Sequence, residues 1–364
     1  MLSVAVAAAI VYFALRLFNK KDALSDAALM PFGAAATYAY TGTGFYYVDA
    51  AGAELRFYDI ASMTTTSSFA LGTTDVLLEA NGDTAVIYTG TAAHIVGMDA
   101  PIETAGQIVS VRCGTAHIAV ESANDGTKLH IYDRSGSMVD EIGFKGSALL
   151  SFGFSANAGA ESLWTLSLDT SSTLPVSTLT IYSYSDAGPA MTGIITLQSQ
   201  LADDIVFSPR SIFVAGTNQL MRFDRAVSSE SYRLLTYGYR YADSSLGANK
   251  PLFMLLPRTS SGGAAAAGEA EAFTYSMVRL LGAAEGELSD EASALVQLED
   301  GIHSIYVMGG KLLAFSGDTM YTYKATGELE SQRALPVDRV VRVIKLSETR
   351  FLMQRGGSLY LVSL

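Results

Sequence analysis

Charged residues are scarce in this 364-residue chain, since Asp, Glu, Lys and Arg make up 16% of it. An average soluble protein holds about 25%. Acidic residues outnumber basic ones, and the formal net charge is −12 at neutral pH. Beyond the pair Lys20 and Lys21 the sequence holds no Lys/Arg cluster. Because a nucleic-acid backbone needs a basic patch, the composition argues against nucleic acid as a partner.

Cysteine is almost absent as well. Cys113 is the only cysteine, which excludes an intrachain disulfide. It lies in the apolar stretch 108–113, so we expect a buried and unreactive thiol.

Long apolar runs are confined to the N-terminus. The sequence carries no charged residue from Met1 to Leu15, and Arg16 comes next. A run of this length is at the lower limit for crossing a bilayer. We expect residues 1–21 to be an uncleaved membrane anchor and residues 22–364 to form one domain. A cleaved signal peptide and a buried amphipathic helix are the alternatives.

The charges beside this run bear on its orientation. Arg16, Lys20 and Lys21 follow the run, and the positive-inside rule would then keep the domain in the cytoplasm. If Met1 is an internal residue of a longer chain, basic residues that precede it would offset the three that follow the run. Our expectation is a single span in the cell membrane with the domain outside the cytoplasm.

A short pattern recurs eight times: an aliphatic residue, two further residues, an aromatic or large apolar residue, and often Asp. The copies begin at Leu55, Ile95, Leu129, Leu179, Leu220, Phe273, Met320 and Leu359. An apolar stretch and a Gly-containing turn signal accompany most copies, as expected for hairpins. Blades of WD40 type repeat every 40–45 residues or so, which fits this spacing.

The repeat predicts an all-β protein, a β-propeller of about eight four-stranded blades, with seven as the alternative count. A protein of two β-sandwich domains is the alternative fold. The eighth copy ends at Leu364, so the last blade lacks a strand, and we expect Asp26–Gly33 to supply it and close the ring. Ser289–Leu298 is interpreted as a short helix.

The repeat resembles that of quinoprotein-like propellers, whose blades carry Leu-x-x-x-Asp followed by Gly. The residues that fit this pattern are Asp59, Asp99, Asp133 and Asp224 with Gly136, Gly188 and Gly327. The Trp of that motif is missing, since Trp164 lies elsewhere, so the resemblance implies the fold without the quinone cofactor. The whole plan is similar to that of an uncharacterised family of membrane-anchored propellers of Gram-positive bacteria, which implies no known activity.

Signals of catalysis are missing from the sequence. The four histidines are His94, His117, His130 and His303, and none has a second ligand at metal-binding spacing. The acidic pairs 203–204 and 299–300 are interpreted as solvated turns at strand junctions. We expect no metal, no cofactor and no enzymatic activity; the alternative is an envelope enzyme whose site is assembled on one propeller face.

Two long connections and a Tyr-rich crossover predict which face of the propeller carries function. The connections are Asp169–Ser177 and Thr259–Glu271, and the crossover between them holds Tyr237, Tyr239, Arg240 and Tyr241. Tyr and Arg often anchor interfaces because they combine a large contact area with a polar end. These four residues are our candidates for binding a protein or glycan partner. The alternative interpretation is that the tyrosines pack between blades.

Overall fold

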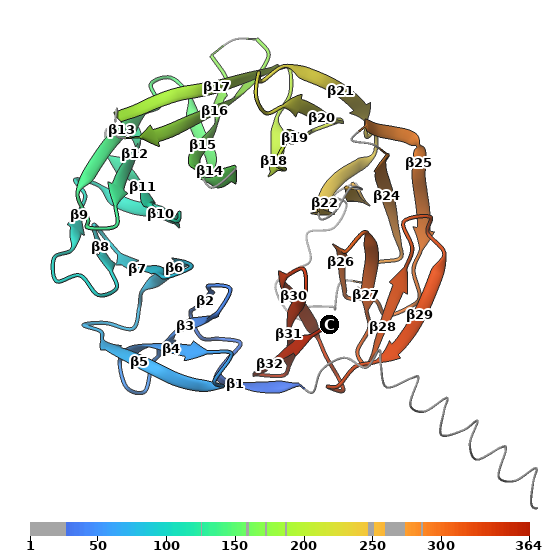
Figure 1. The fold of residues 1–364 in the computed structure, drawn as a ribbon, viewed down its shortest axis with the longest axis horizontal. Helices are drawn as coiled ribbons and strands as arrows, with labels where there is room; N and C mark the ends of the chain where they lie inside the picture. Colours follow the sequence, from blue (N-terminus) through green and yellow to red (C-terminus); the bar gives the residue numbers. More distant parts are fainter. Residues whose placement is uncertain are drawn as a thin grey trace, which may run out of the picture.

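The computed structural model describes residues 27–124, 126–157, 160–171, 173–185, 188–246, 251–258, 274–284 and 287–364. The strands within these ranges form eight antiparallel sheets of four strands each. Figure 1 shows the sheets arranged as blades around a central opening. The prediction of an eight-bladed propeller is therefore confirmed, and the alternative of two β-sandwich domains is wrong.

The expected anchor, residues 1–21, lies outside the residues that the structure describes. Across the described ranges, no helix has both the length and the apolar character that a membrane crossing requires.

Blades are numbered here in chain order, and the first strand of each is the innermost one (Figure 1). Blade 1 holds β2 (Tyr38–Tyr40), β3 (Gly44–Asp49), β4 (Glu54–Asp59) and β5 (Thr64–Ala70). Blade 2 holds β6 (Leu77–Asn81), β7 (Thr84–Thr89), β8 (Ala92–Ile95) and β9 (Ile102–Glu103). Blade 3 holds β10 (Gln107–Cys113), β11 (His117–Asn124), β12 (Gly126–Asp133) and β13 (Met138–Gly143). Blade 4 holds β14 (Ala148–Asn157), β15 (Ala160–Asp169), β16 (Val176–Ser185) and β17 (Gly188–Gln198).

The second half of the ring repeats the plan. Blade 5 holds β18 (Ala202–Phe207), β19 (Ser211–Gly216), β20 (Gln219–Asp224) and β21 (Glu230–Leu235). Blade 6 holds β22 (Tyr239–Ser245), β23 (Leu252–Pro257), β24 (Met277–Ala284) and β25 (Glu287–Gln297). Blade 7 holds β26 (Ser304–Met308), β27 (Lys311–Phe315), β28 (Thr319–Tyr323) and β29 (Leu329–Ala334). Blade 8 holds β30 (Arg342–Ser347), β31 (Arg350–Arg355), β32 (Ser358–Ser363) and β1 (Ala28–Gly33).

Blade 8 joins the two ends of the described chain. Its first three strands come from the C-terminal side, and β1 completes it as the outermost strand beside β32. Ala28 pairs with Leu361 and Gly33 with Ser358. The predicted closure by Asp26–Gly33 is confirmed, because strand Ala28–Gly33 falls within that range. Closure leaves no open sheet edge at the seam of the ring.

Six of the eight repeat copies lie on the third strand of a blade, and two do not. The copy that begins at Ile95 starts where β8 already ends. The copy from Phe273 to Met277 precedes β24, which begins at Met277; Phe273 itself is outside the described residues. Both misplacements arise because a pattern of five residues with two variable positions tolerates a shift along the chain.

The Asp that ends several third strands has a local role in the turn that follows. Asp133 Oδ1 accepts hydrogen bonds from the N–H groups of Ser135 and Ser137, and Asp224 Oδ1 accepts one from Ala226. Such Asx turns satisfy backbone donors that no neighbouring strand reaches. The recurring Asp therefore marks the hairpin between third and fourth strands.

The expected helix at Ser289–Leu298 is wrong, because β25 spans Glu287–Gln297. Exposure alternates along its end, with Leu295 exposed, Val296 buried and Gln297 exposed. That period of two belongs to a strand with one buried face.

The hydrophobic core is divided among the contacts between neighbouring blades. Eight clusters of buried residues each join two adjacent blades. The contact between blades 2 and 3 includes Cys113, which is 6% exposed, and burial raises the pKa of its thiol. The expectation of a buried thiol is confirmed. A thiol with a raised pKa stays protonated at neutral pH and is a poor nucleophile.

Candidate functional site

One face of the ring carries both kinds of connection that sequence analysis singled out. Strands alternate in direction within each blade, so the loop between the second and third strands lies on the same face as the crossover to the next blade. We call this the crossover face. The crossover from β21 to β22 lies here, as does the loop between β15 and β16. That loop is shorter than predicted, since β15 ends at Asp169 and β16 begins at Val176. The stretch Thr259–Glu271 is outside the described residues.

Tyr237 is the most exposed of the four predicted site residues, at 67%. It stands at the tip of a tight turn that closes when the N–H of Tyr239 donates to the carbonyl of Thr236 at 2.9 Å. Gly238 has a φ of 77°, which an L-residue with a side chain adopts only with strain. The Tyr-Gly sequence therefore holds an aromatic ring out over the crossover face.

Tyr239 and Tyr241 are only partly exposed and pack against the cluster between blades 5 and 6. The guanidinium of Arg279 lies 5.6 Å from the ring centre of Tyr239. Burial raises the pKa of Tyr241, whose hydroxyl lies 3.0 Å from Ser244 Oγ. The structure thus divides the predicted set into two exposed residues, Tyr237 and Arg240, and two tyrosines that contribute to packing.

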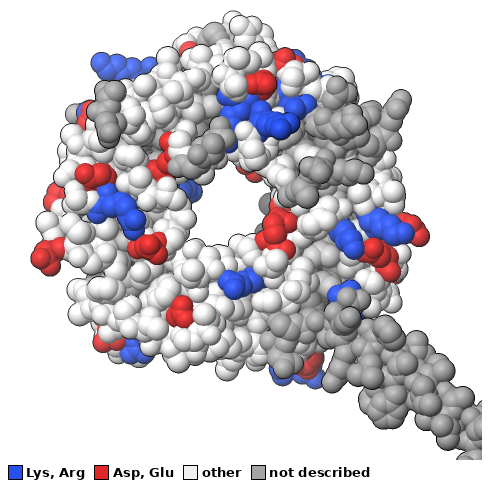
Figure 2. Space-filling model, in the orientation of Figure 1, with Lys and Arg blue, Asp and Glu red and all other residues white. Residues whose placement is uncertain are grey.

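Arg240 and Tyr241 line a cavity of about 630 Å³ on the crossover face, where the inner strands of blades 5 to 8 begin. Figure 2 shows the opening through the ring, with acidic and basic side chains around its rim. The other polar side chains that line the cavity include Asp203, Asp204, Arg258, His303, Ser304, Tyr275, Tyr306 and Arg342. A volume of this size is typical of ligand sites.

The three arginines of the cavity differ in how the protein engages them. Arg258 forms an ion pair with Asp203 at 2.8 Å, and its Nε donates to the carbonyl of Tyr239. Arg240 and Arg342 are exposed, and within the described part of the chain neither guanidinium has an ion-pair or hydrogen-bond partner. These two cationic groups are therefore available to a ligand.

The carboxyl of Asp204 lies in the same recess. Burial raises its pKa, the hydrogen bond from the N–H of Ile205 lowers it, and the carboxylates of Asp203 and Asp243 raise it further. The interpretation of residues 203–204 as a solvated turn is wrong, because both belong to β18. Their position at the start of an inner strand brings them to the cavity.

His303 and Ser304 form the one adjacent pair in the cavity that resembles a base with a nucleophile, with Nδ1 and Oγ 2.9 Å apart. Ser304 is 6% exposed, however, and its hydroxyl accepts the N–H of Val343 at 3.0 Å. Burial lowers the pKa of His303, which keeps the ring neutral. The hydroxyl of Ser304 therefore ties β26 to β30, as a structural contact.

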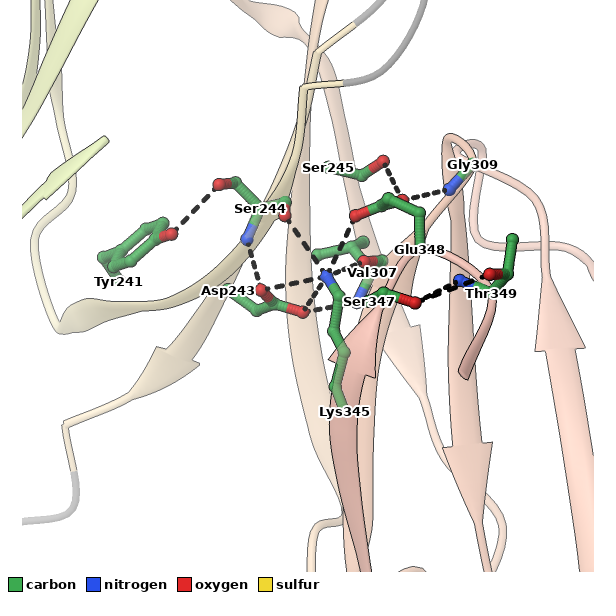
Figure 3. A network of polar contacts seen from close by, with 10 residues as sticks. All are labelled: Tyr241, Asp243, Ser244, Ser245, Val307, Gly309, Lys345, Ser347, Glu348 and Thr349. Atoms are coloured by element: carbon green, nitrogen blue, oxygen red, sulfur yellow. Dashed lines mark hydrogen bonds and ion pairs between the residues drawn. The ribbon is translucent and has the colours of Figure 1, made fainter. Parts of the chain in front are cut away.

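A second polar network lies further along the same inner strands, and Figure 3 shows Lys345 at its centre. Lys345 Nζ lies 3.2 Å from Asp243 Oδ2 and donates to the carbonyl of Val307 at 2.7 Å. Asp243 Oδ2 also accepts the N–H of Val307. Glu348 Oε1 lies 3.3 Å from Lys345. The network ties β22, β26 and β30 together, and its charges are met by protein partners.

The remaining histidines that the sequence singled out are engaged with nearby groups or exposed. His117 Nδ1 lies 3.0 Å from Glu161 Oε1, and His130 Nε2 lies 3.0 Å from Ser122 Oγ. His94 is exposed. Among the described residues there is no group of three or more His, Cys, Asp or Glu that could hold a metal ion.

Glu161, on β15 in the other half of the ring, has a carboxylate that several protein donors engage. Its oxygens accept hydrogen bonds from the N–H groups of Thr115, Ala116 and His117, all in blade 3. A Cβ at Gly114 would collide with this carboxylate. Burial alone would raise the pKa of Glu161, but the hydrogen bonds from Thr115 and His117 outweigh it and lower the pKa.

Sequence reasoning found Arg240 and Tyr241 and missed most of the other residues that line the cavity. Asp203, Arg258, His303 and Arg342 lie far apart in the chain and share no motif. The signal they do share is positional. Most of them lie at or near the first residues of an inner strand, just after a crossover, and such positions converge only once the ring closes.

Comparison with known proteins supports the fold. No protein-family model matches the sequence, and no curated protein matches it. The WD40 domain of SCAP from fission yeast is similar in structure, with a TM-score of 0.57 at 10% identity over 94% of this chain and 96% of that one. Sqt1 from Saccharomyces cerevisiae has a TM-score of 0.56 at 11% identity, over 94% and 100%. BamB from Moraxella catarrhalis has a TM-score of 0.55 at 11% identity, over 94% and 98%. In architecture the chain is thus similar to propellers of WD40 and BamB type.

Proposed function

We propose that the protein is a non-catalytic binding module, a propeller that recognises a protein or glycan partner through its crossover face. The observation that carries the proposal is the cavity of about 630 Å³, with two arginines that have no ion-pair or hydrogen-bond partner in the described chain. The exposed Tyr237 lies in the turn that leads into β22, the strand that carries Arg240. Arg and Tyr are residues that commonly anchor interfaces. The alternative remains an envelope enzyme with a site on this face.

We also propose that the propeller works at the cell envelope, held to the membrane by residues 1–21 and facing away from the cytoplasm. The support is the sequence alone, in which an apolar run without charge precedes Arg16. Membrane fractionation should find the full chain in the membrane pellet. Protease added to intact cells, with any wall removed, should digest the propeller, whereas digestion only after lysis would reverse the orientation.

The binding function is tested by capture with the tagged full chain from its native membranes. Tyr237→Ala combined with Arg240→Ala should reduce capture of a reproducible partner by about tenfold and leave the melting temperature nearly unchanged, because both side chains are exposed. The matched control is Met138→Ala with Arg210→Ala, which removes exposed side chains on the opposite face. Equal capture by both double variants would reject the crossover face as the binding face.

A further inference from the structure

We propose that the cavity on the crossover face binds an acidic peptide segment of a protein partner, with Arg240 and Arg342 holding its carboxylates. This inference rests on the proposed binding function and names the chemistry of the partner. It concerns one site, the cavity that spans the inner strands of blades 5 to 8.

The charge of the cavity is opposite to the charge of the protein. Its lining includes three arginines and two aspartates, which leaves one positive charge in excess, in a chain whose net charge is −12. Arg258 and Asp203 neutralise each other at 2.8 Å. The charges that remain in the lining are the two cations of Arg240 and Arg342 and the carboxylate of Asp204. Because the chain is acidic overall, an acidic partner is repelled by its net charge and attracted where cationic groups are in excess, as they are in this recess.

The two free arginines line the same cavity. Arg240 is on β22 and Arg342 is on β30, and β26 lies between these inner strands in the ring (Figure 1). A segment of a few residues in this cavity can contact both guanidiniums, each of which offers paired donors that match a carboxylate.

Exposed apolar side chains on the crossover face favour a peptide over a glycan. Leu201, Leu235 and Tyr237 are 40%, 48% and 67% exposed. Leu201 and Tyr237 lie in the crossovers before and after blade 5, and Leu235 is the last residue of β21. Aliphatic side chains gain from contact with other apolar side chains, whereas a polysaccharide presents mainly hydroxyl groups. Arginines next to exposed aromatic and aliphatic residues are the usual composition of protein interfaces.

The test is a selection of random 12-residue peptides, displayed on phage, against the purified full chain. Enriched peptides should combine Asp or Glu with Leu, Phe or Tyr. One enriched peptide is then synthesised with a fluorescein label, together with an analogue in which Asn and Gln replace its acidic residues. Fluorescence polarisation gives the dissociation constant for each.

Each substitution has its own expected direction. Arg240→Ala and Arg342→Ala should each weaken binding of the acidic peptide by about tenfold, the usual effect of losing a charge-assisted hydrogen bond. Asp204→Asn should strengthen binding, because it removes the one unpaired negative charge among the carboxylates that line the cavity. Arg210→Ala is the matched control, since Arg210 is an exposed arginine in the turn between β18 and β19 on the opposite face, and it should change nothing.

Several results would overturn the proposal. They are the absence of any enriched peptide, enrichment of neutral or basic peptides, and equal binding of the Asn/Gln analogue. Saturable binding of polygalacturonate that depends on Arg240 and Arg342, without any enriched peptide, would assign the cavity to an acidic glycan instead. Enriched peptides that depend on Tyr237 but on neither arginine would keep the proposed binding function and reject the acidic ligand. Peptide binding that depends on none of Tyr237, Arg240 and Arg342 would reject both the proposed binding face and the acidic ligand.

Discussion

The inner strands β22 and β30 carry two kinds of polar cluster, and the contrast separates structure from function. In the network of Figure 3, Lys345 contacts Asp243, Glu348 and the carbonyl of Val307, all within 3.3 Å. About 10 Å away along the same strands, at 3.3 Å per residue, Arg240 and Arg342 find no such partner in the described chain. Charges that protein groups satisfy hold blades together, while charges that face a cavity unpaired are open to a ligand.

The Glu161 cluster shows the saturated kind of site in the other half of the ring. There a single carboxylate collects several N–H groups of blade 3 and the ring of His117. Its side chain is 9% exposed. No acceptor capacity remains for an external molecule, so we assign this cluster to the contact between blades 3 and 4.

The largest expected effect comes from breaking the closed network. Lys345→Met keeps the length of the side chain and removes the charge, so Asp243 loses its ion-pair partner and the carbonyl of Val307 loses the hydrogen bond from Nζ. We expect the free energy of unfolding in urea to fall by about 3 kcal/mol, the lower end of the range for buried pairs that lose one partner, because Lys345 and Asp243 are only partly buried. Lys311→Met is the control, because Lys311 and Glu330 are 48% and 33% exposed and surface pairs contribute little. Equal losses in both variants would show that the network stabilises no more than a surface pair.

A smaller loss is expected from the Glu161 cluster, and it should depend on pH. Glu161→Gln turns an amide N–H₂ toward backbone N–H donors, and the free energy of unfolding should fall by about 2 kcal/mol at neutral pH. Because the folded pKa is lowered, the stabilisation by the carboxylate is present above the ordinary glutamate pKa and is lost as pH falls through the folded value.

The measurement is urea unfolding of both proteins between pH 7 and pH 3. The gap between wild type and Glu161→Gln should narrow toward acid. Glu328→Gln serves as the control, since Glu328 is 67% exposed. A gap that stays constant over this range would contradict a lowered pKa.

The smallest effect on stability is expected at the open cavity. Arg240→Ala with Arg342→Ala removes two exposed side chains that have no hydrogen-bond or ion-pair partner in the described chain, so the free energy of unfolding should change by less than about 0.5 kcal/mol. If the free energy of unfolding fell as much as in Lys345→Met, these arginines would stabilise the fold, and the two clusters would not differ in role.

Local sequence patterns were sufficient to predict the propeller architecture. Strands and hairpins leave short signals, and their recurrence predicted eight blades and a final blade completed by β1. Where the pattern was loose it failed, as at Ile95 and at Ser289–Leu298. The first lies at the end of a strand and the second is a strand rather than a helix. Residue type alone does not distinguish these cases, since pairing with a neighbouring strand decides them.

The candidate site depended on tertiary structure. From the sequence, Tyr239 and Tyr241 looked equivalent to Tyr237, yet the turn at Gly238 exposes Tyr237 and the other two pack between blades 5 and 6. Nothing in the chain links Asp204 to Arg342. They line one cavity because every inner strand starts at the same face, so ring closure brings together the first residues of successive blades. The sequence by itself predicted the propeller and a count of about eight blades through local periodicity, and only closure of the ring decided which charges meet, because that depends on contacts between distant segments.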